Sequence, residues 1–150
     1  MYIISACLMG ENCKYNGENN RTQWVLDFVE DQNVIAVCPE ELGGLTTPRD
    51  PSEQQGSRVV SKTGKDVTRE FHKGAEAAFR VAVAAAELAG EPIRGAILKA
   101  RSPSCGRKTI YDGNFKGTIV EGDGIFARLL TELGIPVITD EEEEKKGELL

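Results

Sequence analysis

Four cysteines are the residues of this sequence best suited to chemistry, namely Cys7, Cys13, Cys38 and Cys105. Four are too few for a disulfide scaffold, and a chain of 150 residues builds a hydrophobic core without one. As reduced thiols they leave three interpretations open. They are small buried hydrophobic residues, or zinc ligands that lack the usual short Cys-x2–4-Cys spacing, or iron–sulfur ligands, which distant segments supply when the fold gathers them.

Three of the cysteines follow segments that predict β-strands. Residues 2–5, 34–37, 95–99 and 136–139 are short, nearly continuous apolar runs, a pattern typical of strands buried on both faces of a parallel sheet. Cys7 comes two residues after the first run, Cys38 directly follows the second, and Cys105 lies a few residues past the third. Because parallel strands share one carboxyl edge, we expect these three thiols to converge.

Helices are predicted between these strands, at residues 21–31, 66–89 and 123–133. Asp66 and Asp123 are the expected N-caps of the last two, and Leu133 is expected to face the core. The alternation of strands and helices predicts an α/β fold with a small parallel, Rossmann-like sheet flanked by helices. We expect residues 1–150 to form a single domain with the strand order 2-1-3-4.

Two long inserts interrupt this alternation, at residues 41–65 and 106–122, and the second is predicted to hold a turn between two short extended pieces. Inserts longer than about 12–15 residues are usually functional or disordered. Both follow the carboxyl ends of strands, where open α/β sheets bind ligands. Residues 141–150 are expected to be a charged tail, solvated or frayed.

The charge balance excludes some partners. Lys and Arg number 18 and Asp and Glu 24, for a net charge of −6, which argues against a broad nucleic-acid surface. No apolar run approaches the roughly 20 residues that cross a bilayer, so no membrane association is expected. The N-terminal residues do not resemble a secretion signal. We therefore expect a cytoplasmic protein, a monomer or homodimer.

Several segments together carry a family resemblance. They are SACLMG (5–10), CKYNG (13–17), VCPEELGGL (37–45), TPR (47–49), KARSPSCG (99–106), IYDG (110–113), GT (117–118) and EGDG (121–124). In this order and spacing the sequence resembles the thiouracil desulfidase (TudS) family, formerly a domain of unknown function. The resemblance extends over residues 3–139, nearly the whole chain.

This resemblance implies a [4Fe–4S]-dependent enzyme that removes sulfur from thiolated uracil without net redox chemistry. The family's three cluster ligands correspond to Cys7, Cys38 and Cys105, which leaves the fourth iron free to take the thione sulfur while water attacks the carbon. Its catalytic acidic residue corresponds to Glu40 and its catalytic serine to Ser102. Cys13 is not counted among the ligands. Such a cluster can be lost in an aerobic preparation.

The chemistry of these side chains is consistent with those roles. A carboxylate at Glu40 could take the proton of the attacking water, with Glu41 as the alternative. The hydroxyl of Ser102 could donate to the ring carbonyl, relay a proton, or simply cap a turn before Pro103. Ser104 could donate a hydrogen bond to a cluster sulfide.

Positive charge near the same sheet edge suggests substrate contacts. Lys99 and Arg101 could balance an anionic cluster or bind a nucleotide phosphate. Arg49, with the glycines at 43 and 44, is a second candidate anion site. We therefore expect substrate binding by Ser104, Arg49, Lys99 and Arg101.

The substrate expected from the chain length and charge is small. Thiouracil or a small thiolated nucleoside or nucleotide fits better than intact tRNA. Two alternatives stay open. One is a non-catalytic metal or iron–sulfur module, which a fourth ligand from Cys13 would favour, and the other is a metal-free cysteine sulfur carrier.

Overall fold

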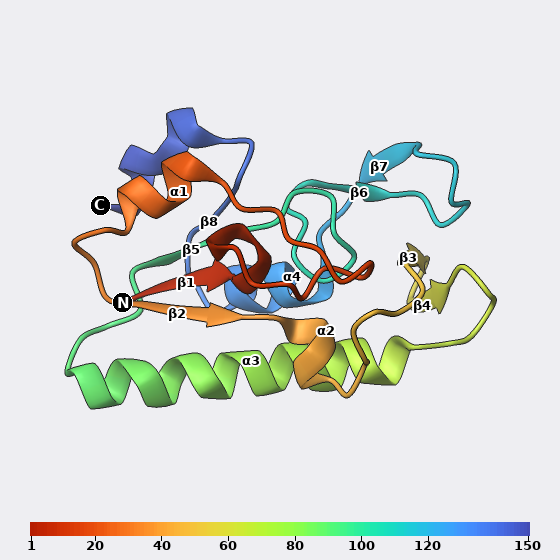
Figure 1. Ribbon diagram of the computed structural model, residues 1–150, viewed down its shortest axis with the longest axis horizontal. Coiled ribbons are helices and arrows are strands. Elements are labelled where there is room, and N and C mark those ends of the chain that lie inside the picture. The colour runs from red at the N-terminus through yellow and green to blue at the C-terminus, as the bar shows by residue number, and fades with distance from the viewer.

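The computed structural model describes residues 1–150 and contains one central sheet of four parallel strands (Figure 1). The strands are β1 (Tyr2–Ser5), β2 (Val34–Val37), β5 (Gly95–Leu98) and β8 (Val137–Thr139). They lie in the order β2-β1-β5-β8, with Ile3 of β1 opposite Ile35 and Ala96 of its two neighbours. The predicted α/β fold and strand order are confirmed, and the last two strands are each one residue shorter than expected.

Helices cover both faces of this sheet (Figure 1). Helices α3 (Thr68–Ala89) and α4 (Ile125–Glu132) pack on one face with Ile3. Helix α1 (Gln23–Phe28), which is shorter than predicted, packs on the other face with Tyr2 and Ile4. The alternation of side chains along β1 therefore supplies both halves of the core. None of the helices combines the length and apolar character needed to span a bilayer.

The two predicted helix caps differ from the structure. Helix α3 has Val67 rather than Asp66 at its N-cap, although the Asp66 carboxylate still accepts the N–H of Thr68 at 2.9 Å. The prediction for Asp123 is wrong, because α4 is preceded by Gly124 and its first N–H groups donate to the carbonyls of Pro103 and Ser104. Backbone carbonyls thus satisfy the groups that a side chain was expected to cap.

Two further expectations about packing fail. Leu133 is 51% exposed, because α4 has ended before it and the chain turns at Gly134. The charged C-terminal segment forms a 3-10 helix, Glu143–Leu149, in which Leu149 is buried. The hydroxyl of Tyr2 donates to the Leu149 carbonyl at 2.8 Å. This apolar residue anchors the tail, which is packed rather than frayed.

The inserts form small elements beyond the carboxyl ends of the strands (Figure 1). Helix α2 (Pro39–Leu42) leads into the first insert, which holds the hairpin β3 (Ser52–Gln55)–β4 (Arg58–Ser61). The second holds the hairpin β6 (Thr109–Tyr111)–β7 (Ile119–Glu121), which confirms the predicted turn. The buried Glu53 carboxylate joins the two hairpins, because it accepts the N–H groups of Gly113 (3.0 Å) and Phe115 (3.1 Å).

Helix α2 lies directly on the backbone of α3. A Cβ added at Gly74 of α3 would stand 1.8 Å from the carbonyl oxygen of Pro39, and one added at Gly43 would stand 2.0 Å from that of Glu70. Both positions therefore require glycine for close approach of the two backbones. This contact fixes the start of α2, where Cys38 and Glu40 are placed.

Candidate functional site

A cavity of about 530 Å³ lies at the carboxyl ends of β1, β2 and β5. All four cysteines line it, together with every other predicted site residue except Arg101. Cys7 comes from the 3-10 helix Ala6–Met9 after β1, Cys38 from the residue between β2 and α2, and Cys105 from the loop after β5. The four are free thiols. The predicted convergence of the three strand-end cysteines is confirmed.

The loop that carries Cys105 is held by the start of α4. The carbonyl oxygens of Pro103 and Ser104 accept the N–H groups of Ile125 (3.0 Å) and Phe126 (2.8 Å). Ser102 accepts the N–H groups of Ser104 and Cys105 through its hydroxyl oxygen, at 3.2 and 3.1 Å. The turn-capping alternative for Ser102 is therefore observed, and its catalytic role stays a prediction.

The thiols differ in acidity. Burial raises the pKa of Cys7 and raises that of Cys105 to about 12, against hydrogen bonds from the Ser5 and Ser104 hydroxyls that lower it. Cys38 behaves oppositely, because a hydrogen bond from the Cys13 thiol lowers its pKa, and the backbone N–H of Glu41 lowers it further. The same bond raises the pKa of Cys13. Of the three strand-end cysteines, Cys38 is thus the one whose pKa is lowered.

Glu40 is the centre of a hydrogen-bonded network inside the cavity. Its Oε1 accepts from Nε of Arg49 at 3.0 Å, in an ion pair whose side chains are 15% and 9% exposed, respectively. Its Oε2 accepts from the Ser104 hydroxyl at 2.9 Å, and Ser104 lies 2.9 Å from the Ser102 hydroxyl. The predicted carboxylate and serine are therefore joined through Ser104. Glu41, the alternative carboxylate, is exposed and does not line the cavity.

Arg49 contacts protein groups rather than an open anion site. Besides Glu40, its guanidinium donates to the hydroxyl of Thr47 (2.6 Å), the carbonyl of Thr46 (3.3 Å) and the carbonyl of Cys13 (2.8 Å). Gly43 packs on α3 and presents no anion cradle. The geometry makes Arg49 the residue that orients Glu40 and joins its own loop to helix α2 and to the Cys13 loop.

The other two basic residues are also paired. Lys99 lines the cavity, and its ammonium lies 3.5 Å from a carboxylate oxygen of Asp140. Arg101 is outside the cavity and forms an ion pair with Glu141. The structure thus brings Lys99, but not Arg101, to the predicted site.

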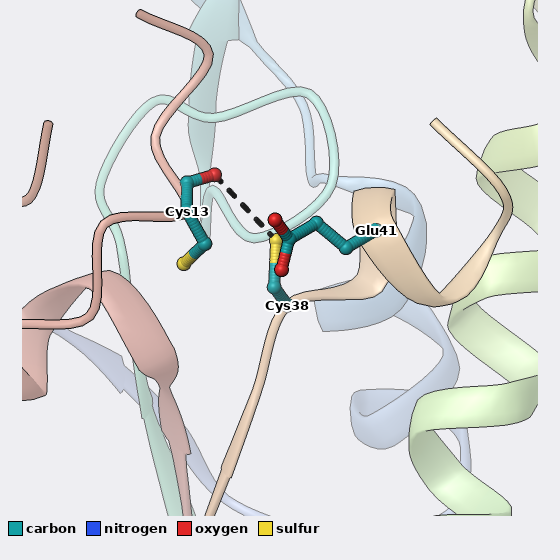
Figure 2. Close-up of side chains that lie close together, drawn as sticks. All are labelled: Cys13, Cys38 and Glu41. Carbon is teal, nitrogen blue, oxygen red and sulfur yellow. Dashed lines mark hydrogen bonds between the residues drawn. The ribbon is translucent and has the colours of Figure 1, made fainter. Parts of the chain in front are cut away.

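Sequence reasoning missed what Cys13 contacts. This side chain is 5% exposed and lies beside Cys38 and Glu41 (Figure 2). The signal available was the six-residue spacing from Cys7 in one loop, but spacing does not say toward which strand end that loop folds. Three aromatic side chains also line the cavity. Tyr15 comes from the loop that carries Cys13, and Tyr111 and Phe115 come from the β6–β7 hairpin.

Comparison with known proteins extends over almost the full length of the chain. Residues 2–142 match the family described as 2-thiouracil desulfurase. The protein YbbK of Bacillus subtilis (strain 168) is 35% identical, over 95% of this chain and 97% of its own length. A solved structure, described as the [4Fe-4S]-dependent thiouracil desulfidase TudS, is 41% identical, with a TM-score of 0.82 over 99% of this chain and 93% of that chain. The chain belongs to the 2-thiouracil desulfurase family.

Proposed function

We propose that this chain is a [4Fe–4S]-dependent desulfidase that converts thiouracil, or a small thiolated nucleoside or nucleotide, into its oxygen counterpart and sulfide. The observation that carries the proposal is the single cavity in which three strand-end thiols meet the linked side chains of Glu40, Ser104 and Ser102. The TudS structure, 41% identical, supports the same reaction class. A cytoplasmic location, where thiols stay reduced, suits such a site.

The donor set fits the cluster. Thiolates are the ligands that iron–sulfur clusters prefer, and three free thiols from different segments line one cavity. The hydroxyl oxygen of Ser104 lies 3.6 Å from the sulfur of Cys105, so this ligand adjoins the serines that lead to Glu40. We assign Cys7, Cys38 and Cys105 as the ligands. A cluster held by three cysteines supplies an iron with an open position, a Lewis acid that polarises a C=S bond.

Glu40 is the proposed general base. Replacing the sulfur of a thione by oxygen needs a water molecule that loses a proton as it attacks the carbon. The Glu40 carboxylate lines the cavity and is fixed by Arg49 and Ser104 from two sides, so its orientation is set before substrate binds. Fixed orientation of a proton acceptor is a large part of its catalytic effect.

Ser102 is the proposed entry to a proton relay. The single proton of the Ser104 hydroxyl is directed at Glu40 at 2.9 Å, so the 2.9 Å contact between the two hydroxyls has Ser102 as its donor. Ser102, Ser104 and Glu40 then form a chain along which a proton moves by successive hydroxyl transfers. This arrangement favours a relay role for Ser102 over donation to the ring carbonyl.

Iron-dependent turnover is the direct test of the proposed function. We expect the anaerobically reconstituted chain to convert 2-thiouracil or 4-thiouracil into uracil and sulfide, both quantified. Cys7→Ser and Cys105→Ser should fail to hold the cluster and should be inactive. A chain that binds the cluster but never turns over would instead be a non-catalytic module. A chain that desulfurates without iron would be a cysteine sulfur carrier.

The relay predicts a specific effect at Ser102. Ser102→Ala should lower turnover by about 100-fold, the lower end of the range for proton-transfer groups. The iron content measures whether the cluster is retained, as we expect. Ser102→Thr keeps a hydroxyl and should retain most of the activity. Full activity in Ser102→Ala would remove this residue from the mechanism.

A further inference from the structure

Cys13 lies beside two side chains. One is the proposed cluster ligand Cys38, and the other is the carboxylate of Glu41, which does not line the cavity. The sulfur atoms of Cys13 and Cys38 and a carboxylate oxygen of Glu41 all lie within 4.8 Å of one another. Figure 2 shows the two segments that supply them, with Cys13 from the loop before α1 and the other two from the start of α2. The proposed desulfidase chemistry uses neither Cys13 nor Glu41.

We propose that Cys13, Cys38 and Glu41 form a second metal site, which binds a thiophilic divalent cation such as Zn²⁺ when the chain lacks its cluster. Two thiolates and a carboxylate are among the ligands that zinc prefers, and a water molecule would complete four-coordination. In tetrahedral zinc sites with Zn–S bonds of about 2.3 Å the sulfur atoms are roughly 3.8 Å apart. Ligand atoms within 4.8 Å therefore need only a small adjustment.

The protein around these ligands restrains them. The sulfur of Cys38 lies 3.8 Å from the carbonyl oxygen of Cys13, the contact dashed in Figure 2, and Arg49 donates to the same carbonyl at 2.8 Å. One oxygen of Glu41 accepts the Thr47 hydroxyl at 2.5 Å. Outer contacts of this kind orient ligands in established metal sites.

Charge also favours a cation at this position. The two sulfur atoms lie within 4.8 Å of each other and of a Glu41 carboxylate oxygen, and thiols that bind a metal do so as negatively charged thiolates. Glu41 then adds a third negative donor at the exposed side.

Cys38 belongs to both sites, so the cation and the cluster exclude each other. This consequence rests on the proposed function, in which Cys38 is a cluster ligand. Cation binding then gives the cluster-free chain a defined state, in which Cys38, one of the three thiols needed for cluster assembly, is bound to the cation. Removal of the cation then precedes insertion of the cluster.

The cation site is tested on the reduced, cluster-free full chain, titrated anaerobically with Co²⁺ as the spectroscopic probe. We expect one Co²⁺ per chain, displaced by Zn²⁺, with thiolate charge-transfer absorption of two-sulfur strength. Cys13→Ser should weaken binding by about tenfold or more, since losing a ligand exceeds the effect of losing an outer contact. Cys7→Ser and Cys105→Ser should bind Co²⁺ as the unmodified chain does. Loss of binding in these two variants, with Cys13→Ser unchanged, would place the cation at the three strand-end cysteines and overturn the proposal.

Cluster assembly provides the second readout. Iron content and absorption after reconstitution should show a cluster in Cys13→Ser and none in Cys7→Ser. Zinc loaded beforehand should slow assembly in the unmodified chain and have little effect in Cys13→Ser. Equal slowing in both would contradict mutual exclusion through Cys38. Absence of a cluster from every chain, with Co²⁺ binding intact, would overturn the proposed function and leave the cation site standing.

Discussion

Glu40→Gln is expected to lower desulfidase turnover by about 10²- to 10⁴-fold, the range for a group that transfers a proton in the transition state. The amide keeps the size of the side chain and an oxygen that can accept from Ser104, but it cannot take a proton from water. Turnover with a thiolated uracil, normalised to iron content, measures the effect. The matched control is Glu11→Gln, an exposed carboxylate of a loop at the same sheet edge that does not line the cavity, which should keep normal activity.

The same substitution also affects stability, and a second variant separates the two effects. Arg49 is buried against Glu40, and removing one partner of a buried ion pair costs about 3–5 kcal/mol because the other charge is left uncompensated. Glu40→Gln combined with Arg49→Met removes both charges. The free energy of unfolding should recover toward that of the unmodified chain, whereas turnover should not. Recovery of turnover in the double variant would show that Glu40 acts only as the counter-charge of Arg49.

The convergence of the cysteines was predictable from sequence because it depends on topology alone. Parallel strands end at one edge, so residues such as Cys7, Cys38 and Cys105 that follow the strands lie together regardless of side-chain detail. The strand positions themselves followed from continuous apolar runs. Glu40 was singled out by the family resemblance, and its position agrees with the same topology, since only two residues separate it from a strand end.

The partners of these residues were not predictable, because they come from the inserts. Arg49 was predicted to bind an anion. In the structure the 41–65 segment folds back, so that the backbone N–H of Arg49 donates to the carbonyl of Tyr15 and the Arg49 side chain donates to Glu40. Nothing in local sequence specifies that path, which is set by long-range contacts. The place of Cys13 beside Cys38 depends on the same meeting of loops.

Asp123 illustrates a local signal overridden by tertiary structure. An aspartate before an apolar helix is a standard N-cap pattern. Here the carbonyls of the Cys105 loop satisfy the helix N–H groups, and the Asp123 carboxylate instead accepts from the Lys108 backbone (2.7 Å) and the Arg107 side chain (3.0 Å). Instead of capping the helix, Asp123 thus links the two ends of the second insert.

Gly74→Ala is expected to destabilise the fold and weaken retention of the cluster, although helix propensity alone predicts the opposite sign. Alanine in a helix interior is favoured over glycine by about 0.5–1 kcal/mol. A Cβ at Gly74 would stand 1.8 Å from the Pro39 carbonyl oxygen, so the backbone of α2 must move, and overpacking of this kind typically costs about 1–3 kcal/mol. The steric effect is the larger of the two.

The expected movement of α2 away from α3 links stability to function. Helix α2 begins at Pro39, between Cys38 and Glu40, so any movement away from α3 shifts a proposed ligand and the proposed base together. Because the gain in helix propensity of about 0.5–1 kcal/mol offsets part of the steric cost of about 1–3 kcal/mol, denaturant unfolding should show a net loss of roughly 1–2 kcal/mol. Iron content should fall in the fraction that remains folded. Lys73→Ala, at the exposed neighbouring position of α3, should change stability by less than about 0.5 kcal/mol. A Gly74→Ala chain more stable than the unmodified one would mean that α2 is free to move without loss, and the close backbone contact would then not be what places Cys38 and Glu40.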